Sequence, residues 1–295
     1  MKNNFTKLGL GTSTIASLGK SLSYVHAKKL FDIALDYNIR TIDTSDTYGS
    51  GDAEKLIGKI VKDKRNNFFI ISKVGYRYLS LPNFFFPLNQ IGKKILQNFK
   101  SKKCFKKEYI LSGIEKSLKR LKIENLDCFL LHDPILFDLS TNNQESCEAL
   151  YLIKKKGLSE FVGISTNDEE SIYHTINNIK LDLIQTRMIY KKDNLNILNN
   201  IKKNNYKLIV NSLFNKEINQ DFNIKIDQLL KNFNISKEDK KSVLIAYCIT
   251  QKKIDCALFR THNIDHLKQI ALGFNKYKKN YNNIFSIIDE IINDN

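Results

Sequence analysis

Short apolar runs alternate with longer segments of helical periodicity along almost the whole chain. The runs are rich in Ile, Leu, Val and Phe and lack strict polar–apolar alternation, which is typical of parallel strands covered on both faces. We predict strands at residues 7–11, 41–43, 68–72, 126–131, 161–164, 183–185, 208–211 and 256–258. Helices are predicted at 24–37, 53–62, 107–121, 145–156, 169–178, 194–204, 237–251 and 264–271, with one further helix over 277–293. Ser236, followed by Glu238 and Asp239, is the expected N-cap of the seventh helix.

Eight β–α units in 295 residues indicate a closed (β/α)8 TIM barrel, forming one domain of α/β class. The competing architecture is a doubly wound sheet, which usually carries a glycine fingerprint after its first strand. Here that turn reads Gly-Leu-Gly-Thr-Ser-Thr at 9–14, and no third glycine opens a helix. The sequence therefore favours the barrel.

Residues 76–106 follow the third predicted strand and fall outside the eight units. A loop of this length is usually functional or disordered, and it leaves the barrel at the mouth where strands end, so we expect it to wall the substrate pocket. The segment is aromatic and basic. Its lysines suggest an anionic substrate such as a phosphorylated or nucleotide-linked sugar, although a solvated charged helix over 93–107 explains them equally well.

The chain has a formal net charge of +16, with 47 Lys and Arg against 31 Asp and Glu. The positive residues are spread along the sequence, which indicates a solvated lysine-rich surface or an attraction for anionic ligands such as a dinucleotide. We expect no nucleic-acid partner, because no basic block stands out. No apolar run approaches the roughly 20 residues needed to cross a bilayer. The N-terminus carries no signal-peptide hydrophobic region, so we expect a cytoplasmic protein without membrane insertion.

Cysteine and histidine usage gives no metal or disulfide pattern. The five cysteines are scattered and include no Cys-x-x-Cys pair, which argues against a disulfide framework or a structural zinc site. His262 and His266 have the i, i+4 spacing of two ligands on one helix face. No carboxylate or thiol accompanies them at ligand spacing, so we expect no metal.

Four polar residues close or follow three consecutive predicted strands: Asp43, Tyr48, Lys73 and His132. In a (β/α)8 barrel the C-terminal strand ends meet at one mouth, so these side chains should converge. A nearby ammonium lowers the pKa of a phenol, and a carboxylate holds that ammonium in place. Tyr48 would then protonate a carbonyl oxygen while His132 donates a hydrogen bond to it. The hydride must come from a cofactor, because no side chain supplies one.

Each of these residues also has a structural explanation when it is considered alone. Asp43 could cap a turn, Lys73 could be an ordinary strand-end lysine, Tyr48 could lie in a surface turn, and His132 could terminate a strand. The functional interpretation depends on the four occurring together, in this order.

With these motifs the chain resembles an aldo-keto reductase over nearly its full length, from about residue 8 to the eighth helix. The resemblance lies in Gly-Leu-Gly-Thr at 9–12, Asp-Thr-Ser-Asp-Thr-Tyr-Gly at 43–49, Glu-Lys-Leu-Ile-Gly at 54–58, Ile-Ser-Lys at 71–73, Ser-Leu-Lys-Arg-Leu at 117–121, Leu-Asp-Cys-Phe-Leu-Leu-His at 126–132, Phe-Val-Gly-Ile-Ser at 161–165, and Gln185. It implies a (β/α)8 oxidoreductase that uses NAD(P) without a Rossmann fold. It also implies that Asp43, Tyr48, Lys73 and His132 are the catalytic tetrad, with Tyr48 as general acid.

The resemblance further implies a cofactor site. Ser165 and Gln185 match positions that hold the nicotinamide carboxamide, and Gly11, Thr12 and Asp43 match positions beside the nicotinamide ribose. Ser212 and Leu213 match the segment that runs along the pyrophosphate. Arg260 and Thr261 match the region that holds the 2′-phosphate. Thr166 replaces a common asparagine, and His266 stands where many members have arginine. The nicotinamide-stacking aromatic after strand seven is replaced by Asn211 or supplied by Phe214. We therefore expect NADPH, with NADH as the alternative.

The expected activity is reduction of a small-molecule aldehyde or ketone, such as one derived from a sugar, by a monomer or weak homo-oligomer. Two alternatives remain open. One is an NAD(P)-dependent aldose dehydrogenase, because microscopic reversibility lets Tyr48 act as acid or base. The other is a cofactor-binding regulatory subunit with little turnover, which the intact tetrad disfavours.

Overall fold

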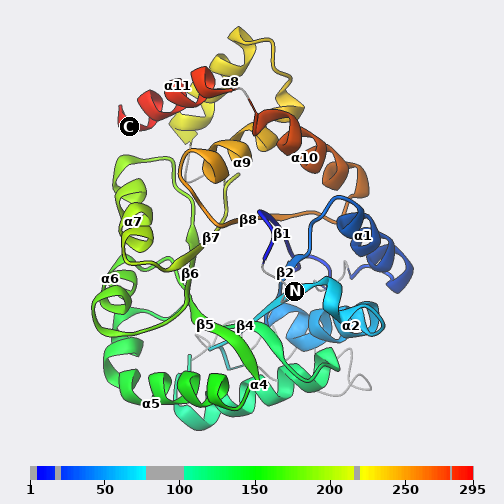
Figure 1. Cartoon of the computed structure of the whole chain (residues 1–295), viewed down its shortest axis with the longest axis vertical. Helices are drawn as coiled ribbons and strands as arrows, with labels where there is room; N and C mark the ends of the chain where they lie inside the picture. Colours follow the sequence, from blue (N-terminus) through cyan, green and yellow to red (C-terminus); the bar gives the residue numbers. More distant parts are fainter. Residues whose placement is uncertain (1–4, 17–20, 78–102, 216–219, 280, 295) are drawn as a thin grey trace, which may run out of the picture.

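Eight parallel strands close into a barrel in sequence order, so the predicted (β/α)8 architecture is confirmed (Figure 1). The computed structural model describes residues 5–16, 21–77, 103–215, 220–279 and 281–294. The strands are β1 (Leu8–Gly11), β2 (Thr41–Asp43), β3 (Phe69–Val74), β4 (Leu126–His132), β5 (Ser159–Ser165), β6 (Leu183–Arg187), β7 (Lys207–Asn211) and β8 (Cys256–Arg260). Several strands extend one or two residues past the predicted ends. They therefore include Lys73, His132, Ser165 and Arg260 as strand residues.

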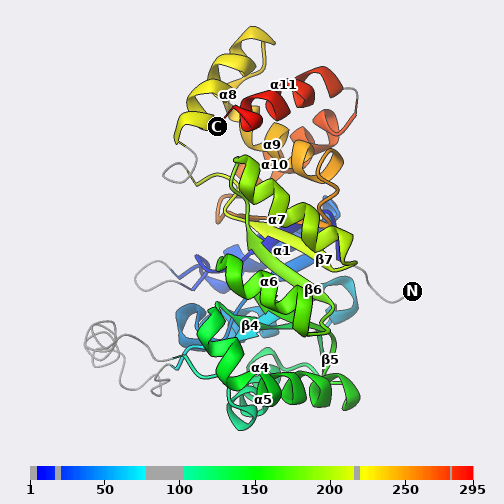
Figure 2. The ribbon, with the colours of Figure 1, turned by 90° about the vertical axis from the view of Figure 1, so that its left-hand side faces the viewer.

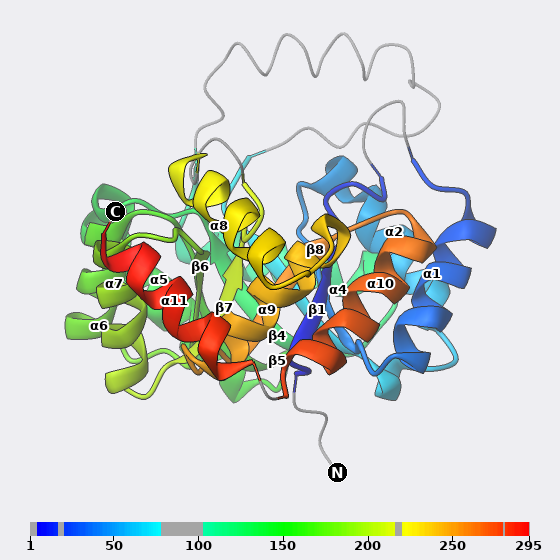
Figure 3. The same cartoon turned by 90° about the horizontal axis from the view of Figure 1, so that it is seen from above.

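Helices surround the barrel and cover its outer face (Figures 1 and 3). They are α1 (Tyr24–Asp36), α2 (Asp52–Val61), α4 (Lys107–Leu121), α5 (Leu136–Lys155), α6 (Glu169–Asn178), α7 (Lys192–Lys203), α9 (Lys240–Thr250) and α10 (Ile264–Tyr277). On α4 the apolar side chains recur every three or four residues and are all buried: Ile110, Ile114, Leu118 and Leu121. Such a stripe drives a helix onto a sheet by removing apolar surface from water. Within the described ranges, no helix is both long enough and apolar enough to cross a membrane.

Within the described residues, two α-helices lie outside the eight units, beside one another at one end of the molecule (Figure 2). The first, α8 (Gln220–Asn232), was not predicted, although its buried residues Phe222, Ile226 and Leu229 have helical spacing. The second, α11 (Asn282–Asn293), replaces the predicted helix over 277–293, because Tyr277 is the last residue of α10. The Ser236 cap is confirmed, since its Oγ accepts a hydrogen bond from the Asp239 amide at 3.2 Å. The cap begins a 3-10 turn, and α9 follows it.

The inward faces of the strands are apolar near their starts and polar near their ends. On β3, Phe69 and Ile71 belong to the cluster inside the barrel, and Lys73 occupies the same face two residues later. On β4, Leu130 belongs to that cluster and His132 follows two residues later. The full interior cluster comprises Phe69, Ile71, Cys128, Leu130, Leu183, Ile209, Cys256 and Leu258. An apolar floor therefore lies below a polar layer at the mouth of the barrel.

Candidate active site

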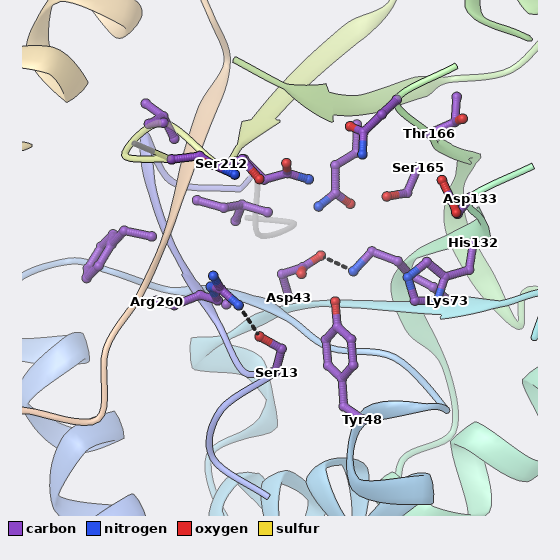
Figure 4. A pocket seen from close by; sticks show the side chains of 18 of the residues that line it. Ser13, Asp43, Tyr48, Lys73, His132, Asp133, Ser165, Thr166, Ser212 and Arg260 are labelled. Carbon is purple, nitrogen blue, oxygen red and sulfur yellow. Dashed lines mark hydrogen bonds and ion pairs between the residues drawn. The ribbon is translucent and has the colours of Figure 1, made fainter. Parts of the chain in front are cut away.

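A cavity of about 470 Å³ opens at the C-terminal strand ends (Figure 4). Most of the residues singled out from the sequence line it: Gly11, Asp43, Tyr48, Lys73, His132, Ser165, Gln185, Ser212, Leu213 and Arg260. In Figure 4 the Tyr48, Lys73 and His132 side chains lie near Ser165, while Arg260, Ser13 and Ser212 lie at the other end. The site thus has a tetrad end and a basic end.

Asp43 and Lys73 form a buried ion pair at the tetrad end. Lys73 Nζ lies 2.5 Å from Asp43 Oδ1 and donates to the Thr44 carbonyl oxygen at 2.9 Å. The Lys73 side chain is 1% exposed. Burial alone would lower the pKa of Lys73, but the charges of Asp43 and Tyr48 and the hydrogen bond to Asp43 raise it above its ordinary value. Lys73 is therefore a fixed cation.

Tyr48 lies on a 3-10 turn (Tyr48–Gly51) after β2, with its hydroxyl pointing toward the ion pair (Figure 4). Lys73 Nζ is 5.5 Å from the centroid of its ring. Burial raises the pKa of Tyr48, and the Lys73 ammonium opposes that rise without reversing it. The lowering expected from the sequence is thus wrong for the protein without ligand, because the loss of water outweighs one nearby cation. Gly49, at φ 59°, completes the turn where a Cβ would lie 2.4 Å from the Ala16 carbonyl oxygen.

His132 ends β4 and presents its ring to the cavity between two tyrosines. The rings of Tyr48 and Tyr76 lie edge-on to it, with centroids 6.0 Å and 5.2 Å away. Burial, reinforced by the charges of Lys73 and Lys103, lowers the pKa of His132 to about 3. The imidazole is therefore neutral near pH 7 and carries one N–H. Its Nδ1 atom lies 3.0 Å from Ser45 Oγ.

Ser165 and Gln185 are paired neighbours on β5 and β6 and both line the cavity. Gln185 Oε1 is buried and has no hydrogen-bond partner within the described chain. A buried amide oxygen without a partner is costly, so it indicates a ligand that donates a hydrogen bond. Thr166 instead donates to the Pro134 carbonyl oxygen at 2.7 Å, and Asn167 Oδ1 accepts from the Arg187 amide at 3.1 Å.

Two predicted cofactor residues, Thr12 and Thr261, do not line the cavity. Thr12 donates through its amide and through its hydroxyl to the Asp43 carbonyl oxygen, both at 2.9 Å, and so joins β1 to β2. The Thr261 hydroxyl is 3.1 Å from the Asn263 carbonyl oxygen and accepts from the Asn263 amide at 3.0 Å. Their hydroxyls are thus used within the chain.

Arg260 extends from the end of β8 and is exposed. Its Nη1 donates to Ser13 Oγ at 3.2 Å. Gly11 lies against the Arg260 side chain, where a Cβ would come within 3.1 Å of Cγ. Ser13 was not singled out from the sequence. The only signal for Ser13 in the sequence was its position two residues after Gly11, the residue that ends β1.

Asp133 and Lys103 join the two ends of the predicted 76–106 insertion, whose residues 78–102 lie outside the described chain. Tyr76 and Lys103 form an antiparallel β-bridge. The Tyr76 hydroxyl donates to Asp133 Oδ2 at 2.5 Å, and Lys103 Nζ donates to the Asp133 carbonyl oxygen at 2.5 Å and lies 3.1 Å from Oδ2. Tyr76 and Asp133 line the cavity. The sequence analysis did not single out Asp133, so it missed this junction.

A second cavity of about 560 Å³ lies between α8, α9 and α10. Phe214, which follows β7, lines both cavities. His266 and Gln269 of α10 line the second cavity together with Lys241, whose Nζ is 5.6 Å from the centroid of the Phe214 ring. Phe214 is therefore a lining residue common to the two cavities.

The chain is similar to a D-threo-aldose 1-dehydrogenase from a Pseudomonas species, with 27% identity over 184 residues, 60% of this chain and 55% of the relative. It is also similar to the uncharacterized oxidoreductase YqkF of Bacillus subtilis, with 27% identity over 164 residues, 55% of this chain and 45% of the relative. The chain thus matches about half the length of these curated relatives.

Solved structures share the fold. One is the aldo-keto reductase AKR11C1 from Bacillus halodurans in its holo form, with a TM-score of 0.79 and 17% identity, covering 97% of this chain and 92% of that one. Another is the putative aldo-keto reductase PA4992 from Pseudomonas aeruginosa, with a TM-score of 0.68 and 18% identity, covering 92% and 91%. The model of the aldo/keto reductase family matches residues 7–290, nearly the whole sequence. The chain therefore belongs to the aldo/keto reductase family.

Proposed function

We propose that this protein is an NADP(H)-dependent oxidoreductase that reduces an aldehyde or ketone, with Tyr48 as the general acid. The observation that carries the proposal is the buried Asp43–Lys73 pair beside the Tyr48 hydroxyl, in the wall of a cavity that His132 also lines. A buried ion pair alone is weak support for stability, because desolvation offsets its attraction. Its place at the mouth of the barrel makes a role in catalysis the better explanation.

The two cavities fit a nicotinamide dinucleotide. The unpaired amide oxygen of Gln185, next to Ser165, suits the carboxamide of a nicotinamide ring. Ser212, Leu213 and Phe214 continue from the first cavity to the second, which has room for the adenosine half. When bound in this position, the cofactor supplies a hydride to the substrate carbon.

The chain's own residues would supply the proton and the orientation. As charge develops on the carbonyl oxygen, Tyr48 O–H donates its proton to that oxygen. The high pKa of Tyr48 keeps the phenol protonated beforehand, and an alkoxide is basic enough to take the proton from it. Lys73 stabilises the phenolate that remains, because its ammonium stays charged. His132 orients the oxygen by a hydrogen bond, which strengthens as negative charge builds on it.

The basic end of the site favours NADPH over NADH. Arg260 projects from β8 beside Ser13 and is exposed toward the cavity that it lines. A planar guanidinium suits a phosphate dianion better than it suits a ribose hydroxyl. In the second cavity, Lys241 and His266 add positive or hydrogen-bonding groups. The 2′-phosphate of NADPH would lie between these residues and Arg260.

A second candidate is the oxidation of an aldose. A relative of this chain is named D-threo-aldose 1-dehydrogenase, and the lining of the cavity includes the polar residues Tyr76, Asp133 and Asn167. Such groups suit a hydroxylated substrate. In that direction the Tyr48 phenolate would accept the proton of the sugar hydroxyl, by microscopic reversibility.

The test is nicotinamide absorbance measured with both cofactors against aldoses, phosphosugars and simple aldehydes, for the wild type and for Tyr48→Phe. We expect wild-type turnover with at least one class, a loss of turnover in the variant, and nearly unchanged cofactor affinity. Cofactor binding with negligible wild-type turnover would instead favour a regulatory subunit. No cofactor binding at all would refute the proposal.

A further inference from the structure

Ser45 Oγ lies at a junction of hydrogen bonds directly behind His132. It is 3.0 Å from His132 Nδ1, 3.2 Å from Asp46 Oδ1 and 3.0 Å from Thr47 Oγ1, and it accepts from the Thr47 amide at 3.2 Å. Ser45 has no exposed surface. Among the described residues, its hydroxyl therefore interacts with these groups, and burial keeps bulk water from competing for it.

The position of one hydrogen atom decides what His132 offers to the cavity. A serine hydroxyl donates one hydrogen bond, and a neutral imidazole carries one N–H. If Ser45 donates to His132 Nδ1, the imidazole proton is on Nε2, on the opposite side of the ring. If Ser45 donates to Asp46, the imidazole proton must be on Nδ1 to bond Ser45, and Nε2 is then an acceptor. Only the first arrangement gives a carbonyl oxygen a donor.

We propose that Ser45 is a positioning residue that holds His132 as the Nε2–H tautomer, and that Asp46 is the group that competes for the Ser45 hydrogen. The proposal rests on the proposed function, because a donor at Nε2 is useful only to an oxygen substrate beside Tyr48. Ser45 and Asp46 lie inside the Asp-Thr-Ser-Asp-Thr-Tyr sequence at 43–48. The sequence motif alone did not indicate this role for either residue. If the Ser45 hydroxyl donated its hydrogen bond to Asp46 instead, His132 would adopt the opposite tautomer.

At slightly acidic pH the surroundings of Asp46 keep that competition weak. Asp46 is buried and faces Glu54 of α2 and Arg120 and Tyr109 of α4. Burial, and then the charge of Glu54, raises the pKa of Asp46 to about 7, while Arg120 acts in the opposite direction. A protonated Asp46 is a weaker acceptor for the Ser45 hydrogen than a carboxylate and can donate its own hydrogen to Ser45 Oγ. The hydroxyl is then free to donate to His132.

The test is ¹⁵N NMR of the folded protein labelled at histidine, with the His132 signals assigned by their loss in His132→Gln. At about pH 6, where Asp46 is largely protonated, we expect an unprotonated Nδ1 and a protonated Nε2 in the wild type. Ser45→Ala should shift both signals toward a mixture of tautomers. Ser45→Cys, which nearly preserves volume, should shift them in the same direction, because a thiol is a weaker donor. A protonated Nδ1 in the wild type, or unchanged signals in both variants, would overturn the proposal.

Kinetics supplies the second readout. Ser45→Ala should lower kcat for carbonyl reduction roughly tenfold to hundredfold, the loss expected for one weakened hydrogen bond in the transition state, with a smaller change in KM. NADPH affinity should not change. The matched control is Ser146→Ala, which removes another buried serine hydroxyl, bonded at 3.0 Å to the Phe105 carbonyl oxygen. Equal kcat losses in both variants would reduce Ser45 to a packing role.

The two readouts separate this proposal from the proposed function. The NMR signals report the tautomer whether or not any substrate is turned over. Wild-type protein that reduces no carbonyl but shows Nε2–H would contradict the function and leave the assignment of Ser45 standing. Active protein with a protonated His132 Nδ1 would support the proposed function and contradict the assignment of Ser45.

Discussion

Lys73 Nζ lies 2.5 Å from Asp43 Oδ1 in a site where both side chains are almost completely removed from solvent. The pair brings together the ends of β2 and β3, which are neighbours in the barrel. Removing one partner of such a pair leaves the other as a buried, uncompensated charge, which costs more than the pair contributes. Variants at this pair must therefore be judged for folding before they are judged for activity.

Lys73→Met should lower turnover by roughly 10²- to 10⁴-fold, the range typical of a lost acid–base contribution. The reason is that the phenolate left on Tyr48 loses the cation that stabilises it. The double variant Lys73→Met, Asp43→Asn removes both charges and is the control for misfolding. Steady-state kinetics and thermal unfolding should be measured together. An active, folded single variant would remove Lys73 from proton transfer.

Arg260→Ala should weaken NADPH binding about tenfold to hundredfold and leave NADH binding nearly unchanged, because only NADPH carries the 2′-phosphate. Fluorescence titration with both cofactors measures this. Arg187→Ala is a suitable control, since it removes an arginine at the end of β6 outside the lining of either cavity. Equal losses for the two cofactors would mean that Arg260 makes no 2′-phosphate contact.

Asp46 should make stability fall as pH rises from about 4 to about 7. Its pKa is raised to about 7 in the folded protein from an ordinary value near 3.8, so across this window the folded state holds a proton that the unfolded state has lost. Below the window both states are protonated, and above it both are ionised. Over about three pKa units the contribution is on the order of 4 kcal/mol. Urea unfolding of the wild type and of Asp46→Asn at both ends measures it.

In Asp46→Asn this contribution is absent, so the variant should gain stability relative to the wild type as pH rises through the window. Other titrating groups act equally on both proteins and cancel in the difference. A constant difference between the two proteins from acidic to neutral pH would mean that Asp46 is ionised throughout. It would also remove the support that Asp46 gives to the His132 tautomer.

Lys103→Met should raise KM for a hydroxylated substrate several-fold, with only a small change in Tm. Lys103 holds Asp133 and the Tyr76 end of the insertion beside the cavity, and a partly exposed ion pair contributes only about 0–1 kcal/mol to stability. Lys55→Met removes a similar surface charge, paired with Asp52 at 3.0 Å, outside the lining of either cavity. Unchanged KM together with a large loss of Tm would make the junction purely structural.

The sequence predicted the barrel and the convergence of Asp43, Tyr48, Lys73 and His132 in the cavity lining because both depend on local pattern. Strand ends such as Asp43 and His132 follow apolar runs directly, and in this fold strand ends share one mouth. The helix α8 was missed although its apolar spacing is helical, because the eight β–α units of the predicted barrel were complete without a helix at this position. The pKa of Tyr48 could not be predicted, since it depends on how much water the assembled site excludes.

Long-range side-chain contacts were also beyond reach of the sequence. Ser45 and His132 are separated by 87 residues and meet only because β2 and β4 flank β3. Tyr76, Lys103 and Asp133 likewise meet through hydrogen bonds between segments about 30 to 57 residues apart. No spacing rule connects such positions.

The apolar floor formed by Phe69, Ile71, Cys128 and Leu130 closes the polar layer above it from beneath, and within the described chain the cavity opens at the mouth. Under the proposed function, protons that replenish Tyr48 after each reaction would therefore travel by the same route as the product. Recharging the acid would then follow release of the product along a single path.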